Sequence, residues 1–216
     1  MTGAHVGATY DRIAAHFSKT RAFAWPEIEE FLDGREGFLG LDLGCGNGRH
    51  AEVLADHTER VVGVDASTGL LEEAANRANE RGFTLDLVAG DAATLPLRDG
   101  AVDLAVYVAT IHHLRPRNRR LVSLNELARV LAPSGRALVS AWSTAHSRFE
   151  DEKTDGSGLD TDVAWTLPGG ETVPRFYHVY DPAEFDADLA ESDLVVHASA
   201  LSSGNCYAVV GPSTEP

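Results

Sequence analysis

The sequence contains few cysteines and no long apolar run. Two cysteines, Cys45 and Cys206, are too few for a disulfide framework or a cysteine-rich zinc site. No stretch approaches the roughly 20 consecutive apolar residues that a membrane helix needs. The first ten residues lack the basic-then-apolar pattern of a signal peptide. These absences predict a cytoplasmic protein with no membrane span and no metal site.

Positive charge is also scarce. The chain has 18 Lys+Arg against 33 Asp+Glu, a net charge of −15, and its only lysines are Lys19 and Lys153. Such a balance opposes unaided binding to nucleic acid. We favour a second interpretation, a halophilic archaeal surface. In salt of about 1 M, charge repulsion reaches only about 3 Å, and high net charge maintains solubility. The overall sign then says little about the substrate.

A glycine-rich turn at residues 40–48 is the stretch around which the chain is organised. An apolar run, 38–43, predicts a strand before it, and residues 48–57 predict a helix after it. Glycines have no Cβ and tolerate positive φ, so a ligand can lie against the backbone and its free N–H groups. Residues of this turn that we expect at a cofactor are Asp42, Gly44, Cys45, Gly46, Asn47 and Gly48.

The spacing of the turn favours a cationic ligand. The glycines follow G-x-G-x-G, whereas dinucleotide folds use G-x-G-x-x-G. Asp42 lies at the mouth of the turn, where a carboxylate repels phosphate and suits an amino-bearing or cationic group. A nucleotide remains the alternative from this stretch alone.

A second acid follows the next predicted strand, 60–64. Asp65 lies close to the roughly 20-residue offset at which an acid meets a ribose in nucleotide-type folds, with Ala66 beside it. A carboxylate there can accept both ribose hydroxyls. The alternative is a helix cap for the predicted helix 70–81, a role for which Ser67 and Thr68 compete.

A third acid follows the predicted strand 84–89. Asp91 is suited to accept the amino group of an adenine, while the N–H of Ala92 meets a ring nitrogen. Asp91 is alternatively a simple turn residue. The fourth strand, 101–108, ends at Val108, where the carboxyl ends of parallel strands form a ligand crevice.

Two histidines follow that fourth strand. His112 and His113 are adjacent, so both cannot point the same way. One is expected to pack and the other to lie under the reacting groups. A metal site is not expected, because no third ligand is near in sequence.

Residues 115–120 form the only dense basic run. They are a solvated helix start or a phosphate contact, and the sequence does not separate the two. A helix over 121–131 and a fifth strand over 136–142 follow.

The two ends of the chain read differently from its middle. We expect a helical lid over residues 1–35, with two short helices within 8–33. Tyr10 and Phe17 pack on the core or cover the turn, and packing is favoured. Residues 143–170 predict a flexible insertion containing the acidic, Gly-rich run 150–158. A helix from Asp181 to Ala190 and a hairpin of strands 194–198 and 207–210 close one domain, 1–216.

This pattern resembles the class I S-adenosylmethionine (SAM) methyltransferases, in which Asp-x-Gly-x-Gly-x-Gly is the first cofactor motif. The resemblance implies an α/β fold with a seven-stranded Rossmann-like sheet. Its order would be 3-2-1-4-5-7-6, with helices on both faces and an antiparallel C-terminal strand pair. It also implies SAM as cofactor and S-adenosylhomocysteine (SAH) as product.

Other segments resemble the tRNA wobble-uridine methyltransferases, which convert 5-carboxymethyluridine to its methyl ester. The segments that carry this resemblance are 10–21, Trp25-Pro26, 42–48, 111–113, Ala141-Trp142, 163–168, 175–180 and Gly204-Asn205. The chain departs from the family in two places. Its segment after strand five is short and acidic, and Cys206-Tyr207 replace paired tryptophans.

The implied reaction needs orientation more than proton transfer. A carboxylate is ionised at pH 7, so it needs no strong base, and a guanidinium can fix it in a bidentate grip. The candidate catalytic residues are Arg21, His112, His113, Arg175, Tyr177 and Asn205.

The resemblance further implies tRNA as substrate and a heterodimer with a small zinc-ribbon activating subunit. That subunit would add a strand beside Phe83–Val88, an edge of the sheet. Two alternatives stay open: a methyltransferase of a small-molecule carboxylate or a protein, and a SAM-binding scaffold subunit without catalysis.

Overall fold

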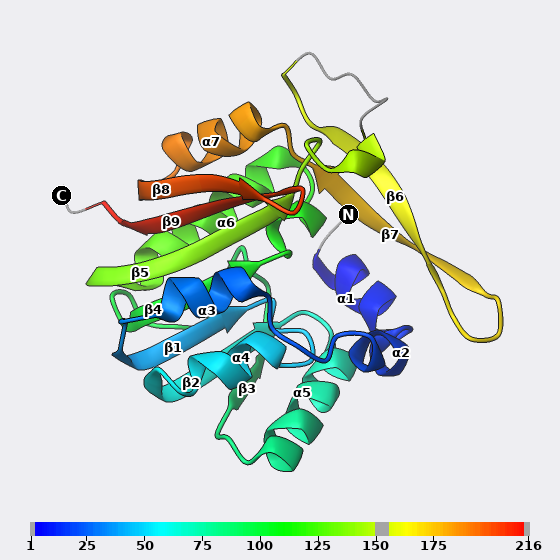
Figure 1. The fold of residues 1–216 in the computed structure, drawn as a ribbon, viewed down its shortest axis with the longest axis horizontal. Helices are drawn as coiled ribbons and strands as arrows, with labels where there is room; N and C mark the ends of the chain where they lie inside the picture. Colours follow the sequence, from blue (N-terminus) through cyan, green and yellow to red (C-terminus); the bar gives the residue numbers. More distant parts are fainter. Residues whose placement is uncertain (1–2, 150–155, 214–216) are drawn as a thin grey trace.

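The computed structural model describes residues 3–149 and 156–213. A seven-stranded sheet has the order β3-β2-β1-β4-β5-β9-β8, in which β1 to β5 are parallel and β8 and β9 antiparallel (Figure 1). The strands are β1 (Gly37–Leu43), β2 (Thr58–Asp65), β3 (Asp86–Ala89), β4 (Val102–Val108), β5 (Leu131–Trp142), β8 (Leu194–Ser202) and β9 (Asn205–Pro212). The predicted fold class is confirmed. The last two strands carry higher numbers because a separate hairpin precedes them.

Helices cover both faces of this sheet. On one face α3 (Pro26–Leu32) and α4 (Arg49–Leu54) share a core with β4 and β5. On the other, α6 (Arg117–Val130) and α7 (Pro182–Glu191) pack against a second core. The helix α5 (Thr68–Arg81) lies beside α4 and contacts β2 and β3. Central strands such as β4 are apolar along their length because both faces are buried.

The N-terminal segment contains three helices where two were expected. They are α1 (Gly3–Asp11), α2 (Ala14–Lys19) and α3. The chain turns after Asp11, whose Oδ1 accepts hydrogen bonds from Ser67 Oγ and the Gly69 N–H. This turn brings Tyr10 of α1 and Phe17 of α2 edge to face, with ring centroids 5.5 Å apart.

Among its described residues, the expected insertion at 143–170 contains a short helix and a strand, so it is not irregular throughout. A short 3-10 helix, η2 (Ser147–Phe149), is followed later by β6 (Leu159–Thr166), which pairs antiparallel with β7 (Thr172–Val179). This hairpin stands apart from the main sheet and lies against α1 and α2 (Figure 1). Trp165 packs on Phe17 with centroids 5.4 Å apart, so burial of aromatic surface orders the segment. Residues 150–155 of the acidic run lie outside the described residues.

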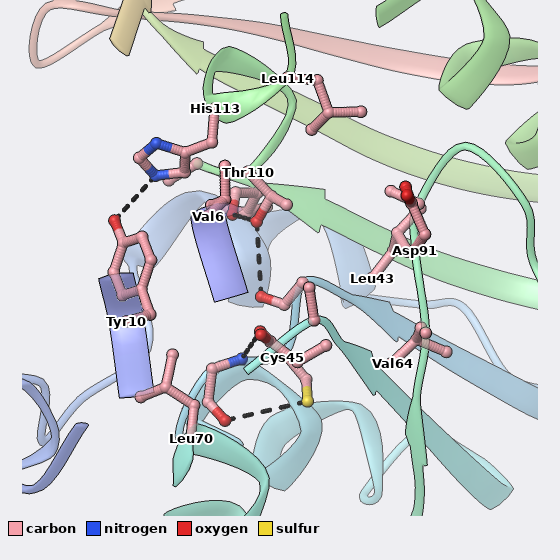
Figure 2. Close-up of a pocket in the computed structure, with 18 of the residues that line it drawn as sticks. Val6, Tyr10, Leu43, Cys45, Val64, Leu70, Asp91, Thr110, His113 and Leu114 are labelled. Carbon is pink, nitrogen blue, oxygen red and sulfur yellow. Dashed lines mark hydrogen bonds between the residues drawn. The ribbon is translucent and has the colours of Figure 1, made fainter. Parts of the chain in front are cut away.

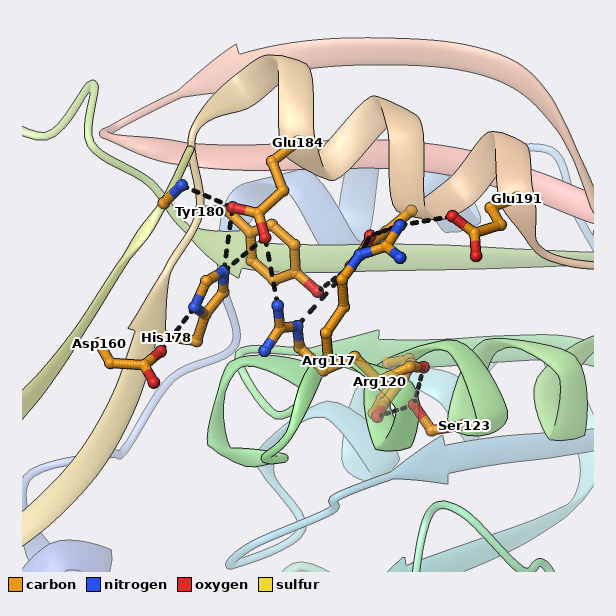
Figure 3. A network of polar contacts seen from close by, with 11 residues as sticks. Arg117, Arg120, Ser123, Asp160, His178, Tyr180, Glu184 and Glu191 are labelled. Carbon is orange, nitrogen blue, oxygen red and sulfur yellow. Dashed lines mark hydrogen bonds and ion pairs between the residues drawn. The ribbon is translucent and has the colours of Figure 1, made fainter. Parts of the chain in front are cut away.

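Three of the four arginines in the basic run, Arg117, Arg119 and Arg120, pair with acids of the protein, which neither sequence interpretation anticipated. The helix α6 begins at Arg117, whose guanidinium contacts Asp188 and Glu191 of α7. Arg120 is buried and pairs with Glu184 and Asp188 (Figure 3). These arginines therefore join α6 to α7.

The same network holds the hairpin. His178 of β7 contacts Glu184 through Nε2 at 3.0 Å and Asp160 of β6 through Nδ1 at 2.8 Å (Figure 3). Since both ring nitrogens meet carboxylates, the base of the hairpin is tied to α7 by polar contacts.

Over residues 3–149 and 156–213, no helix is long and apolar enough to cross a membrane. Within the same ranges, no group of three or more histidine, cysteine, aspartate or glutamate side chains is arranged to hold a metal ion.

Candidate functional site

A cavity opens where β1, β2, β3 and β4 end, and we call it the strand-end cavity (Figure 2). The turns after these strands supply its wall, as open α/β sheets require. The predicted cofactor residues that line it are Gly44, Cys45, Gly46, Asn47, Asp65, Ala66, Asp91, Ala92 and Val108. Asp42 and Gly48 do not line it.

The turn after β1 leaves a bare wall at Gly46. Its φ is 53°, and a Cβ built there would meet no atom within 4 Å, so a side chain would project into the cavity. Gly44 has a different role, since a Cβ there would lie 2.2 Å from Thr110 Oγ1. Gly46 therefore leaves room for a ligand, whereas Gly44 allows the segment after β4 to pack closely against the turn.

Asp65 lies at the centre of the cavity wall. Its Oδ2 accepts a hydrogen bond from the Gly46 N–H at 2.8 Å, and its Oδ1 accepts one from the Ser67 N–H at 2.8 Å. Burial raises the pKa of this carboxyl above its ordinary value. Each oxygen can still accept a further bond from a ligand hydroxyl. The capping role belongs to Ser67, whose Oγ accepts from the Leu70 N–H at the start of α5.

Asp91 also lies on the cavity wall, and it has a partner that the sequence did not suggest. Its Oδ1 accepts from the Ala93 N–H, while Oδ2 pairs with the guanidinium of Arg119. Arg119 itself lines the cavity. The acid is therefore partly neutralised at the position expected to meet an adenine.

Asp42 does not reach the cavity, which corrects its predicted contact with a ligand. It is buried, and its Oδ2 accepts from the Ala51 N–H at 2.9 Å, so it holds the first turn of α4. Its Oδ1 has no hydrogen-bond partner among the described residues. Burial raises the pKa of this carboxyl to about 7.

Asn47 connects the glycine turn to the N-terminal segment. Its Nδ2 donates to Arg21 O at 2.9 Å, and Arg77 of α5 also donates to that carbonyl, at 3.0 Å. The segment between α2 and α3 is thus fixed beside the cavity. The side-chain amide of Asn47 is used for this attachment.

A second cavity adjoins the first on the side of β7, and we call it the hairpin cavity. Its lining residues are Val6, Thr9, Tyr10, His113, Arg115, Asp162, Pro174, Arg175 and Phe176. Five of them also line the strand-end cavity: Val6, Tyr10, His113, Arg115 and Phe176. The two cavities therefore share a wall.

His113 and Tyr10 form the centre of that shared wall. His113 Nδ1 lies 2.8 Å from Phe176 O, and its Nε2 lies 2.8 Å from Tyr10 Oη (Figure 2). A carbonyl oxygen only accepts, so Nδ1 carries the proton, and Nε2 accepts from the tyrosine hydroxyl. Burial lowers the pKa of His113 to about 4, so this imidazole is neutral at pH 7.

Arg175 is a buried cation without an acid partner. It is 6% exposed, and its guanidinium carbon lies 4.9 Å from the ring centroid of Trp165. Its Nη1 donates to Tyr177 Oη at 2.8 Å. Among the described residues it forms no ion pair, and its Nε has no hydrogen-bond partner. A buried guanidinium with spare donors is suited to an anionic ligand.

The other candidate catalytic residues line neither cavity. His112 is buried and accepts from the Trp142 N–H through Nδ1 at 3.1 Å; burial holds its pKa well below the ordinary value. The guanidinium of Arg21 lies over Phe17 and Trp165, beside the cavities. Tyr177 supports Arg175, and Asn205 pairs with Trp142 in the sheet ladder. His113 and Arg175 are the two candidates that meet the cavities.

Sequence reasoning missed several wall residues. They are Val6, Thr9, Thr110, Leu114, Asp162 and Phe176; Tyr10 was weighed only as packing or lid, and Arg115 and Arg119 belong to the basic run that was offered as a phosphate contact. Position after β4 was a usable signal for Thr110 and Leu114. No local pattern marks the others, because their neighbours in space are distant in the chain.

Comparison with known proteins gives matches over most of the chain. A family model described as a methyltransferase domain matches residues 41–139. The tRNA (carboxymethyluridine(34)-5-O)-methyltransferase of Schizosaccharomyces pombe is 32% identical over 185 residues, which cover 83% of this chain and 77% of that protein. The Saccharomyces cerevisiae protein of the same description is 33% identical over 174 residues, covering 79% of this chain and 60% of the relative. The chain spans only 21% of the Mus musculus relative ALKBH8, to which it is 39% identical.

Solved structures share the fold. One is the methyltransferase solved in complex with the Haloferax volcanii Trm112 methyltransferase activator; it matches with a TM-score of 0.71 and 18% identity, over 98% of this chain and 99% of the other. Another is the DhpI–SAH complex, with a TM-score of 0.72 and 18% identity over 97% and 96% of the two chains. At these identities, the likeness concerns the fold alone.

Proposed function

The chain belongs to the tRNA (carboxymethyluridine(34)-5-O)-methyltransferase family and is a SAM-dependent methyltransferase, and on this premise we propose its substrate and partner. The substrate is the carboxylate of a modified wobble uridine in tRNA. The active form is a cytoplasmic heterodimer with a small zinc-ribbon activating subunit.

The strand-end cavity suits SAM. The bare wall at Gly46 admits a ligand against the backbone, and Asp65 is positioned for ribose hydroxyls. Asp91 and the N–H of Ala92 lie where an adenine would be read. Bound there, SAM would supply an electrophilic methyl group and leave as SAH.

The choice of acceptor rests on the buried guanidinium of Arg175, which forms no ion pair among the described residues. Arg175 lies in the cavity that shares a wall with the cofactor site. A carboxylate held there in a fixed orientation needs no base, since it is already ionised at pH 7. Arg175 would hold the carboxylate that receives the methyl group, and bound SAM would supply that group. The neutral His113 on the shared wall fits this scheme, because it adds no second positive charge beside the sulfonium.

The proposed docking site of the activating subunit is β3. This strand ends the sheet on one side, so its outer backbone groups are available for strand addition. Asp86 at its start pairs with Arg60 at 2.6 Å, which leaves the rest of the edge unprotected by ion pairs among the described residues. The Haloferax volcanii complex, in which a chain of this fold is bound to Trm112, supports the proposal.

The decisive experiment is methyl transfer from labelled SAM to bulk tRNA, with and without a zinc-ribbon activator. We expect label in tRNA that digestion to nucleosides assigns to a modified uridine. Mild alkali should release it, because a methyl ester is hydrolysed and an N- or C-methyl group is not. Transfer to small carboxylates or proteins but not to tRNA would replace this proposal by the corresponding alternative. SAM binding without transfer to any acceptor would favour a scaffold subunit.

The partner has its own test. We expect the chain expressed alone to be poorly soluble or to bind SAM weakly, and co-expression to restore both. A single chain that is monodisperse and fully active would contradict the heterodimer.

A further inference from the structure

The helix α1 joins the two cavities through consecutive side chains. Tyr10 lies on the wall that both cavities share. Its neighbour Asp11 points to the start of α5, where it accepts from Ser67 Oγ at 2.7 Å and from the Gly69 N–H at 2.9 Å. Ser67 in turn donates its N–H to Asp65, the acid of the strand-end cavity. Polar contacts therefore run from Asp65 through Ser67 to Asp11, next to Tyr10.

The helix α1 packs in close contact with the turn after β2, residues 65–69. A Cβ placed on Gly7 would lie 2.3 Å from Ala66 O, so the helix backbone touches the backbone of the strand-end cavity. A shift of residues 65–69 would therefore move α1 and the ring of Tyr10 with it.

The direction of the hydrogen bond between the Tyr10 hydroxyl and His113 is fixed. Phe176 O holds the proton of His113 on Nδ1, so Nε2 must accept, and the Tyr10 hydroxyl must donate to it at 2.8 Å. The lone pairs of the hydroxyl remain for Arg175, whose Nη1 lies 3.4 Å away. That guanidinium nitrogen is thus held by two neutral phenol oxygens, from Tyr10 and Tyr177.

Resting on the proposed function, we propose that Tyr10 is a positioning residue. It sets the guanidinium of Arg175 for the acceptor carboxylate and couples that setting to the cofactor turn through α1. Neutral partners orient the cation and leave its charge for the substrate. A carboxylate at the position of the Tyr10 hydroxyl would instead compete with the acceptor.

The test is Tyr10→Phe, which keeps the ring against Phe17 and removes only the hydroxyl. The matched control is Tyr107→Phe, because the Tyr107 hydroxyl is equally buried, bonds Ser123 Oγ at 2.9 Å and lines neither cavity. For methyl transfer to tRNA, we expect Tyr10→Phe to raise KM about tenfold with a smaller change in kcat, the loss expected for one hydrogen bond to a charged group. Tyr107→Phe should leave KM within about twofold of the wild type.

A second readout does not depend on turnover. Imidazole ¹⁵N NMR of the intact chain should show His113 as the Nδ1–H tautomer, with an Nε2 shift that moves in Tyr10→Phe and stays in Tyr107→Phe. A double-mutant cycle with Arg175→Lys should also show non-additive losses in kcat/KM, since Tyr10 acts through Arg175.

The proposed coupling between the cofactor turn and Arg175 also predicts an effect of the cofactor on acceptor binding. Saturating SAM or SAH should tighten acceptor binding in the wild type by more than in Asp11→Asn, where the attachment of α1 to α5 is weakened. Equal KM for wild type and Tyr10→Phe, an unmoved Nε2 signal, or additive losses would each overturn the inference. So would a cofactor effect that Asp11→Asn leaves unchanged. Failure of the proposed function would look different, because the wild type itself would then transfer no methyl group to tRNA.

Discussion

The strand-end cavity and the hairpin cavity are built in different ways. The first is made by turns that follow consecutive strands; its backbone leaves the bare wall at Gly46 and, through the Gly46 N–H, holds Asp65. The second is made by side chains that converge from α1, the 3-10 helix η1 (Ile111–His113) and β7. A site built from backbone depends on chain geometry, whereas a site built from side chains depends on a few identities. Asp65 lines only the first cavity and Arg175 only the second, so substitutions at these two residues should act mainly on one binding step each, although α1 couples the two cavities.

Replacing Arg175 should give the largest effect. Arg175→Met removes the buried cation and keeps an apolar side chain, so we expect kcat/KM for tRNA to fall about a hundred- to a thousandfold, as when one member of a buried charge pair is removed. The dissociation constant of SAM, from isothermal titration, should change less than about twofold.

Arg148→Met is the matched control for this substitution. Arg148 also lies near an aromatic ring, that of Trp142, but lines neither cavity. If Arg175→Met weakened SAM and tRNA equally, the two cavities would not be functionally separate.

The next largest effect is expected from replacing Asp42, and it concerns the free energy of unfolding. The pKa of Asp42 is about 7 in the folded chain against 3.8 unfolded. Between these values the folded chain binds a proton that the unfolded chain has lost, so the Asp42 contribution to stability falls as pH rises through this window. Asp42→Asn removes that loss. Relative to wild type, the variant should gain ~2–3 kcal/mol between pH 5 and pH 8.

Urea unfolding across this pH range checks the Asp42 prediction, with the exposed Asp99→Asn as a control for the loss of one charge. A constant difference between wild type and Asp42→Asn would mean that Asp42 does not titrate in this window.

Replacing Asp65 should have a smaller effect, limited to the binding of SAM. Asp65→Ala removes the carboxylate proposed for the ribose, so the dissociation constant of SAM should rise about tenfold or more. Asp103→Ala is the matched control, because that acid also accepts two backbone N–H bonds, from Phe38 and Leu39, but at the amino ends of β1 and β4. Unchanged SAM affinity in Asp65→Ala would contradict the ribose role.

The ion pair at the hairpin tip should matter least. Arg12 of the segment after α1 meets Glu171 at 2.7 Å, but both side chains are more than half exposed. Glu171→Gln should cost at most about 1 kcal/mol in urea unfolding, and less in high salt. A larger cost would show that charge, rather than the packing of Trp165 on Phe17, attaches the hairpin.

Most residues of the strand-end cavity could be predicted from the sequence, although Asp42 and Gly48 do not line it. Strand, turn and acid follow one another locally, so spacing predicted that Gly46, Asp65 and Asp91 would meet at one edge of the sheet. Asp42 was misplaced because its spacing is right for the turn, while its side chain points beneath it and holds α4. Spacing reports where a residue lies along the chain, not which side of a turn its side chain occupies.

The residues of the hairpin cavity could not be predicted in this way. The sequence could not choose between His112 and His113; η1 sets their rings at 82° and brings only His113 to the cavities. The insertion at 143–170 looked irregular because the partners of β6 and of Trp165 lie elsewhere in the chain.

By itself, the sequence determined the α/β sheet and the cofactor edge, because alternating strands and helices with glycine turns admit few arrangements. The tertiary structure alone decided the acceptor site. Tyr10 meets His113 across 103 residues and Arg175 across 165. Contacts at such separations depend on how α1 and the hairpin pack, and no local spacing encodes that packing.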